Sequence, residues 1–392
     1  MLTYETLSAF RRVKEITAED ATEDTTIQDY LKRATDLIDQ TTKRRFFPYY
    51  DIKRYPVPSM YADLSDRAML SGDLDLGHDL LEVVRAQTGS YLSYVDTNET
   101  VETGGITARQ TVLTVQDADG LDTAGETRFE VGYMLMIDQE TLLVTAINTT
   151  TNEVTVQRGM FDSRPVTHTE GTVINRQKLV TMADDEFYTI DYNYFPRWGL
   201  RVVWPRTWGG HYGATTAGIR YPAIYLTGIW GYHSDYNSAW VDTTDELTAD
   251  VTATDTTLNI QGGSGFDVGF DAGFSLIGTD RLGDTRFEVG QLIRLDDEFM
   301  AVTAVDATAR TLTVIRGYNG SIPLAHLTAT PIDRWSVHHE IKGACFTIAK
   351  ILRESDIAKG GRIGVNEVSN SFEIGIPTDT SLVLKRLVRG QL

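Results

Sequence analysis

The chain has 392 residues and a formal net charge of −19, which is long enough for two or three domains with buried cores. Hydrophobic residues make up 41% and charged residues 23%, as in globular rather than disordered chains. The acidic balance disfavours a DNA-wrapping or membrane-surface protein, although it suits a channel wall along which DNA slides without sticking. The single cysteine, Cys345, excludes an internal disulfide and favours a reducing compartment.

No targeting or membrane segment is expected from the sequence. The N-terminus lacks a long apolar run, which argues against a signal peptide. No uninterrupted apolar window of about 18 residues occurs, so we expect no membrane span and no membrane partner.

The first 45 residues are predicted to be helical. Apolar residues at helical spacing form one stripe that includes Ile27, Tyr30, Leu31, Ala34, Leu37 and Ile38. A shorter helix at about 6–15 should precede this one. Asp24 or Thr25 could cap the start of the longer helix. The cations at 43–45 would lie in the last turn of that helix, where the helix dipole favours positive charge.

From residue 46 to about 105 the chain is predicted to be extended. Pro48, Pro56 and Pro58 disfavour a helix interior. Apolar residues between 74 and 84 indicate short strands.

One stretch of the sequence occurs twice. Residues 127–176 and 285–334 align without a gap, and twenty-two of the fifty positions are identical. A repeat at fixed spacing marks a duplicated folding unit. The resemblance resumes upstream, where 257–260 corresponds to 112–115, with 13 extra residues in the Gly-rich stretch 262–283 of the second copy.

Each repeat is predicted to be a small all-β module. The first copy should contain strands at 134–138, 142–147, 154–158 and 173–176, separated by polar loops. Alternating residues at 153–157 indicate a strand with one buried and one wet face.

The segments on either side of the second repeat differ from it in composition. Residues 179–245 are rich in aromatic residues and glycine, and 225–232 is predicted to be a central strand. After Arg334 the helical period returns, and a helix is expected over about 336–354. The last 30 residues show only weak strand character.

These elements predict an α+β fold in three parts. A discontinuous helical core with β-strands would comprise 1–105, 179–245 and 335–392. Two inserted barrel- or sandwich-like β modules would comprise 106–178 (the first module) and 246–334 (the second module). Insertions of this kind are tolerated because the closure entropy of a loop grows only logarithmically with its length.

Without its inserts, the core resembles the head–tail connector, or adaptor, proteins of tailed bacteriophages. The resemblance covers about half of the chain and is carried by the ordered segments 30–39, 42–47, 74–83, 191–196, 226–232 and 340–353. The repeated pattern, including Phe129-Glu130-Val131-Gly132 and its copy, looks like a β module common in phage virion proteins. Connectors of ordinary length lack two such inserts, so the resemblance does not assign a function to the modules.

The resemblance implies a structural protein of the virion neck, assembled in the host cytoplasm. It implies a ring of about twelve subunits with closed symmetry, bound to the portal protein above and to a stopper or tail-completion protein below. Double-stranded DNA would pass through the channel without specific binding. The channel helices would include Tyr30, Leu31, Leu37, Ile341 and Ile348.

The C-terminal arm is the expected portal-docking element. Lys385, Arg386 and Arg389, with Leu387 between them, form a basic segment on an acidic chain, which suits an acidic partner. The alternative is an ordinary solvated tail.

Chemistry-bearing residues recur in both modules. Asp138, Glu140 and His168 return as Asp296, Glu298 and His326, a set that could bind a metal or catalyse hydrolysis. The structural alternative is favoured, in which Arg158 pairs with Glu130 or Glu140 and Arg316 pairs with Glu288 or Glu298. No catalytic residue, metal ligand or cofactor is predicted, and no phosphate-binding, zinc or nucleophile motif occurs.

Three functions stay open at this stage. The first is a non-enzymatic head-to-tail connector. The second is a virion attachment or decoration protein whose β modules bind host glycan or a fibre. The third is a hydrolase that uses the repeated acid and histidine set.

Overall fold

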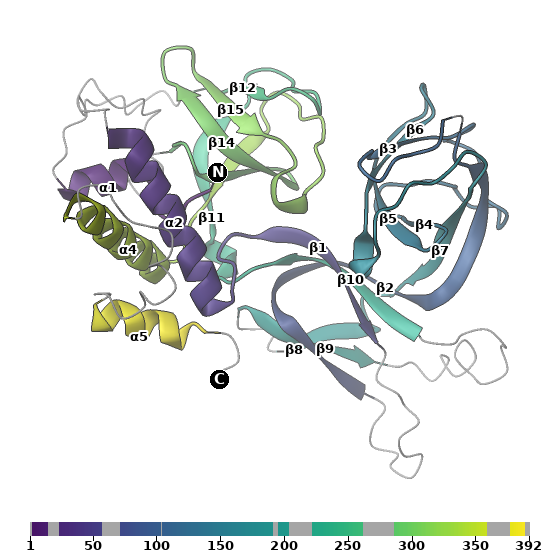
Figure 1. The fold of residues 1–392 in the computed structure, drawn as a ribbon, viewed down its shortest axis with the longest axis horizontal. Helices are drawn as coiled ribbons and strands as arrows, with labels where there is room; N and C mark the ends of the chain where they lie inside the picture. The colour runs from purple at the N-terminus through teal and green to yellow at the C-terminus, as the bar shows by residue number, and fades with distance from the viewer. Residues whose placement is uncertain are drawn as a thin grey trace, which may run out of the picture.

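The computed structural model describes residues 2–14, 23–56, 71–102, 104–190, 195–203, 222–261, 286–358 and 377–388. Within these ranges the chain forms two antiparallel sheets, of ten and six strands, and four α-helices. The helices lie together at one side, beside the six-stranded sheet, and the strands of the first module lie at the far side (Figure 1). The Gly-rich stretch 262–283, most of the segment 191–196 and Arg389 lie outside the described residues.

The predicted helical core is wrong. The described chain is mostly β, and the four helices form one group beside the sheets instead of a helical body with added strands. Two amphipathic helices give strong local periodicity, whereas the segments 49–56, 71–100 and 222–230 signal strand only weakly on their own. Those segments become one continuous ladder by pairing with each other, a tertiary effect that local propensity does not report.

Three helices lie close to their predicted positions, whereas the fourth, at the C-terminus, was not expected from the sequence. They are α1 (Leu7–Lys14), α2 (Asp24–Thr42), α4 (His339–Ala358) and α5 (Thr378–Arg386). Glu23 is the N-cap of α2 and makes no side-chain cap hydrogen bond, and Lys43 adopts a left-handed conformation at its C-cap. The helix α5 corrects the expected strand character of the tail. Its amphipathic side chains are ordered by packing against α2 and α4.

The helical group has a shared core with parts of both sheets. The predicted stripe on α2 is buried except for the half-buried Leu37, and α2 packs against α4. The ends of the core strands complete this cluster, in which Tyr4 stacks on Phe47 at 4.9 Å between ring centroids and Phe46 meets Tyr232 edge-on at 5.4 Å. Helices that are distant in sequence are therefore held together by one apolar cluster, the main source of stability for such amphipathic elements.

The ten-stranded sheet joins the core strands to the first module. Its main path runs β1-β10-β2-β7-β4-β5-β6-β3, and β9 pairs with β2 and β8. The predicted central strand is β10, which lies between β1 and β2. The bounds are β1 (Tyr49–Pro56), β2 (Ser71–Thr100), β3 (Val112–Thr114), β4 (Met134–Ile137), β5 (Glu140–Asn148), β6 (Glu153–Gln157), β7 (Val173–Thr181), β8 (Phe187–Ile190), β9 (Arg197–Val203) and β10 (Pro222–Trp230).

The strand β2 carries the connection between the two parts of this sheet. Its middle pairs with β10 and its C-terminal third pairs with β7, and each of these pairings contains two register shifts. The shifts are bulges, which bend and twist a strand locally. One bent strand thus replaces the several short strands expected from the sequence.

The six-stranded sheet contains the second module and runs β11-β16-β13-β14-β15-β12. Its strands are β11 (Trp240–Glu246), β12 (Thr257–Asn259), β13 (Leu292–Leu295), β14 (Glu298–Asp306), β15 (Thr311–Ile315) and β16 (Pro331–Trp335). Each module has its own buried apolar cluster, and a further cluster lies under the core strands. The division of the chain into three domains stays a prediction.

A buried carboxyl between the N-terminus and α2 gives the first testable prediction. The Tyr4 hydroxyl donates a hydrogen bond to Asp39 and accepts one from the Phe46 N–H at 3.0 Å. Burial raises the pKa of Asp39 from 3.8 to about 6, although Tyr4 and Arg45 act to lower it. The folded state therefore holds this proton more tightly than the unfolded state.

We expect Asp39 to make the protein less stable as the pH rises from about 4 to 6. Its contribution should be on the order of 2 kcal/mol. In an Asp39→Asn variant, which keeps an acceptor for Tyr4, the free energy of unfolding should fall less over this range. Denaturant melts of both proteins at several pH values measure the difference, and parallel pH profiles would contradict the expectation.

Candidate functional site

The two modules correspond element by element. The strands β4, β5, β6 and β7 correspond to β13, β14, β15 and β16, and both modules have a 3₁₀ turn after the third of these strands, η2 (Met160–Asp162) and η4 (Tyr318–Gly320). Gly159 and Gly317 adopt left-handed conformations before the turns, with φ of 71° and 58°. The glycines of the Arg158-Gly159 and Arg316-Gly317 pairs therefore have a positive φ, which glycine adopts without strain.

The structural repeat begins earlier than the aligned sequence. Asp96 pairs with Asn175 and Asp242 pairs with Asp333, each followed by a bulge. Inside the bulges, the Thr97 and Thr243 hydroxyls donate to the facing backbone carbonyl at 2.6 Å. The identical triplets at 95–97 and 241–243 carry this signal in the sequence. Their offset of 146 residues (241 − 95) differs from those of the other two aligned stretches, which are 145 (257 − 112) and 158 (285 − 127).

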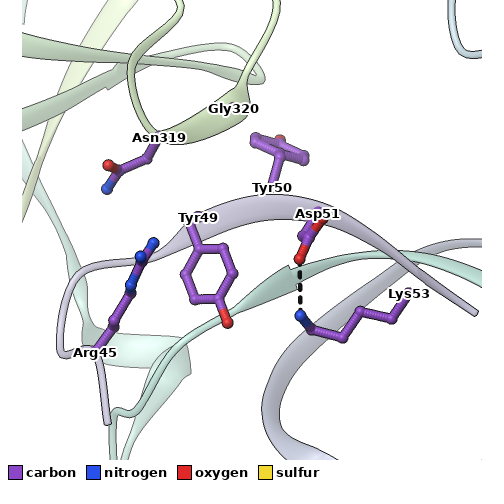
Figure 2. A pocket seen from close by; sticks show the side chains of 7 residues that line it. All are labelled: Arg45, Tyr49, Tyr50, Asp51, Lys53, Asn319 and Gly320. Atoms are coloured by element: carbon purple, nitrogen blue, oxygen red, sulfur yellow. Dashed lines mark hydrogen bonds and ion pairs between the residues drawn. The ribbon is translucent and has the colours of Figure 1, made fainter. Parts of the chain in front are cut away.

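The 3₁₀ turn of each module contacts the same core strand, β1. In the second module, the Asn319 side chain donates to the Pro48 carbonyl at 2.8 Å, and the turn lies over β1 (Figure 2). A Cβ on Gly320 would lie 2.5 Å from the Tyr50 carbonyl oxygen, so the close approach requires glycine there.

The first module uses the equivalent turn differently. Phe161 occupies the place of Asn319, and its ring lies 5.6 Å from that of Tyr225 and 4.9 Å from the Arg54 guanidinium. Arg54 on β1 faces Tyr225 on β10. One duplicated turn thus meets the β1–β10 ladder at two places, once with backbone and amide contacts and once with an aromatic side chain.

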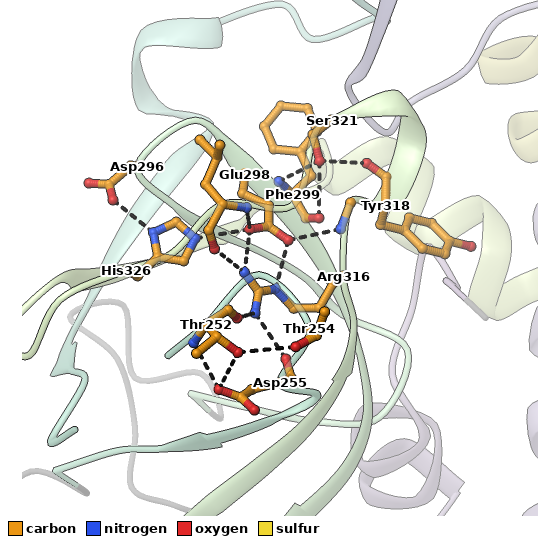
Figure 3. Close-up of polar contacts among 12 residues, drawn as sticks. Thr252, Thr254, Asp255, Asp296, Glu298, Phe299, Arg316, Tyr318, Ser321 and His326 are labelled. Atoms are coloured by element: carbon orange, nitrogen blue, oxygen red, sulfur yellow. Dashed lines mark hydrogen bonds and ion pairs between the residues drawn. The ribbon is translucent and has the colours of Figure 1, made fainter. Parts of the chain in front are cut away.

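A buried polar network holds this turn in each module, and Figure 3 shows the network of the second module. In the second module, the Glu298 carboxylate accepts two hydrogen bonds from the Arg316 guanidinium, both at 2.7 Å. The Gly317 and Leu324 backbone N–H groups donate to it at 2.9 Å, and His326 Nε2 lies 2.9 Å away. The Glu298 and His326 side chains are fully buried.

The other side of the network ties three loops together. Arg316 donates to the backbone carbonyls of Thr252 and Asp255 at 2.6 and 2.9 Å, and also to that of Leu324. His326 Nδ1 lies 2.8 Å from Asp296. Because these partners lie on different loops, the network fixes the end of the module that contains the turn.

The first module repeats this geometry. Arg158 donates to Glu140 twice at 2.6 Å, and His168 lies 2.8 Å from Asp138 and 2.9 Å from Glu140. Arg158 also donates to the Thr107 carbonyl. The predicted pairing of arginine with glutamate is confirmed, and the structure selects Glu140 and Glu298 from the two alternatives for each arginine.

The electrostatics of the network favour ionised glutamates. Burial acts to raise the pKa of Glu298, but the hydrogen bonds from Arg316, the backbone and His326 outweigh it, and the pKa lies below its ordinary value. Glu140 shows the same balance. Two carboxylate oxygens have about four acceptor positions, and five donors already occupy those of Glu298. No group of three metal-ligating side chains suited to an ion occurs among the described residues.

The modules differ in the face that they turn toward the rest of the chain. In the second module, Leu292, Phe299 and Ala301 belong to the cluster that holds the helices. The equivalent residues of the first module are Met134, Thr141 and Leu143, and none of them belongs to that cluster. The second module is therefore integrated with the helical group, whereas the first module is attached through β2, β7 and its turn.

The predicted channel residues lie inside the helical core. Tyr30, Leu31, Ile341 and Ile348 are buried, and Leu37 packs against the same cluster while partly exposed. They join α2 to α4 within one chain.

The exposed face of α2 carries different residues, among them Asp29 and Asp36. Spacing at i and i+7 places these two carboxylates on one side of the helix. The sequence analysis did not single out these two carboxylates.

The predicted docking arm is partly folded onto its own chain. Leu387 is buried, whereas Lys385 and Arg386 are exposed. The Arg386 guanidinium pairs with Glu340 at the start of α4. The helix α5 therefore presents Lys385 to solvent while its apolar side anchors it.

Comparisons with protein-family models, curated proteins and solved structures find no match to this chain. Among the described residues, no helix combines the length and apolarity needed to cross a bilayer.

Proposed function

We propose that this chain is a non-catalytic structural subunit of the neck of a tailed bacteriophage. It forms a ring beneath the portal, joins the capsid to the tail and surrounds the exit path of the DNA. The chain is predominantly β, with the helices as one side of each subunit.

The observation that carries this proposal is that the segments that resemble connector proteins pack together in the fold. The modules separate these segments in sequence, yet Phe46, Tyr232 and the helices α2 and α4 contribute to adjoining parts of one apolar region. Trp335, directly after the second module, donates its indole N–H to the Phe46 carbonyl at 2.9 Å. Segments from both sides of the two modules thus form one core. This arrangement supports the interpretation that the modules are insertions into that core.

The polar features support a structural role over chemistry. The repeated Asp, Glu and His side chains are engaged with one another, with arginine and with the backbone. The exposed carboxylates of α2 would repel passing DNA, which suits a channel that must not retain it.

Cryo-EM of the particle neck tests the proposal. We expect a ring of this chain directly below the portal, with Asp29 and Asp36 toward the channel and the first module on the rim. Density only at the tail tip or on fibres would overturn it and favour the attachment function.

The C-terminal helix gives a prediction about the portal. Lys385 is exposed and makes no ion pair with a described residue, so Lys385→Glu should leave folding intact. If this helix binds an acidic surface of the portal, affinity should fall about three- to tenfold, more so at low salt. Binding assays with purified portal measure the loss.

Arg164→Glu, on an exposed loop of the first module, is the matched control. Equal affinity of the Lys385 variant and the control would remove the helix as the docking element. A greater loss on deletion of the first module, which is not part of the helical cluster, would do the same.

A further inference from the structure

A cationic pocket lies between the second module and β1. It has a volume of about 450 Å³ and is lined by Arg45, Tyr49, Tyr50, Asp51, Lys53, Asn319 and Gly320 (Figure 2). Tyr49, Asp51 and Lys53 alternate with Tyr50 along β1, so they share one face of the strand. β1 is the last strand on its side of the sheet, which leaves this region accessible from outside.

The walls of the pocket are held in place. Asn319 is bonded to the Pro48 carbonyl, and Gly320 is in close contact with the Tyr50 backbone. The Tyr50 ring packs on Phe299 at 4.8 Å. A partner would therefore meet a formed surface, with little ordering cost on this side.

The charge in the pocket is positive on an acidic protein. Lys53 pairs with Asp51 at 2.7 Å, so these two charges offset each other. The Arg45 guanidinium lies over the Tyr49 ring at 5.0 Å. It is exposed and forms no ion pair with a carboxylate among the described residues. Arg45 is thus a pre-positioned guanidinium, suited to bidentate binding of a carboxylate.

A complementary acidic turn lies elsewhere on the same chain. Asp184 and Asp185 lie between β7 and β8, are both exposed, and form no ion pair with a described residue. They are adjacent carboxylates on a short connection. The pocket beside β1 and this acidic turn are different surfaces of the same chain. A contact between them in two molecules would therefore be head-to-tail, the kind of contact that closes into rings.

We propose that the Arg45 pocket binds the acidic turn Asp184–Asp185 of a neighbouring molecule of this chain. This inference rests on the proposed ring-forming function and specifies one of its subunit contacts. The Arg45 guanidinium donates hydrogen bonds to the carboxylates, and its cation–π contact with the Tyr49 ring holds it in position.

A charge exchange tests the contact. Sedimentation velocity over a range of concentrations measures self-association of the full-length chain at low salt. Arg45→Glu alone and the Asp184→Lys, Asp185→Lys double variant alone should each weaken it about tenfold or more. An equimolar mixture of the two variants should restore association. The unchanged Arg45 of one variant meets the unchanged turn of the other, and at the next contact the carboxylate introduced at position 45 can pair with the ammonium groups introduced into the turn.

The controls separate this contact from general effects. Arg109→Glu with Arg164→Glu changes two exposed cations of the first module and should leave association unchanged. Thermal melts confirm that each variant is folded, and Arg45→Ala replaces Arg45→Glu if the latter is not. In that case the mixture is not informative, and weakening by both Arg45→Ala and the lysine double variant supports the contact.

Wild-type protein that is monomeric at all concentrations, variants that associate normally, or the absence of rescue between folded charge-exchanged variants would overturn the inference. A neck ring in particles with no effect of these substitutions would remove only this contact. Absence of the chain from the neck would remove the proposed function.

Discussion

Replacing Glu298 by alanine is expected to destabilise the protein by about 3–5 kcal/mol, the cost of leaving a buried charge without its partner. The Arg316 guanidinium is nearly fully buried and loses two hydrogen bonds, and two backbone N–H groups lose their acceptor. Glu298→Gln keeps the shape and some acceptor capacity, so it should cost less. Denaturant unfolding followed by circular dichroism measures both values.

The first module provides a matched comparison, because Glu140→Ala breaks the same network. The second module contributes Leu292, Phe299 and Ala301 to the core of the helices, whereas the first module has a separate cluster. Hydrogen exchange should therefore rise in α2 and α4 after Glu298→Ala. After Glu140→Ala it should rise only within the first module. The same pattern in both variants would contradict the different integration of the two modules.

Replacing Trp335 by alanine should cost about 3–5 kcal/mol, as for other large buried aromatic residues. The indole is 3% exposed, meets the Trp240 ring at 5.0 Å and donates to the Phe46 carbonyl. The variant would thus leave both a cavity and an unsatisfied carbonyl at the junction of the helices, β1 and the second module.

Two control variants separate these effects. Trp335→Phe restores part of the volume but not the hydrogen bond, so its loss should be intermediate. In the first module, Gln177 occupies the place of Trp335 and bonds to the Tyr225 hydroxyl. Gln177→Ala should cost less, because it removes much less apolar contact. Calorimetric or denaturant melts rank the three proteins, and an equal loss in all three would show that Trp335 does not hold this junction.

The sequence alone determined the elements whose signals are local. The repeat predicted two β modules with matching strands, and the helical stripe predicted α2 with the correct buried face. The Arg158–Glu140 and Arg316–Glu298 pairs were also within reach, since a repeated arginine and glutamate must be satisfied in both copies. These features depend on residues near one another in sequence or on duplication, which both leave a readable pattern.

Only the tertiary structure decided how these elements are joined. The bulged strand β2 serves two parts of one sheet, which turned a predicted helical core into a mostly β body. The two 3₁₀ turns, identical in position, meet β1 through Asn319 in one module and Phe161 in the other. The packing of α5 against α2 and α4 likewise depends on apolar contacts of Leu384 and Leu387 with residues far away in sequence. Pairing, packing and docking join residues that are distant along the chain, and their energies depend on which surfaces meet, so no local pattern in the sequence specifies them.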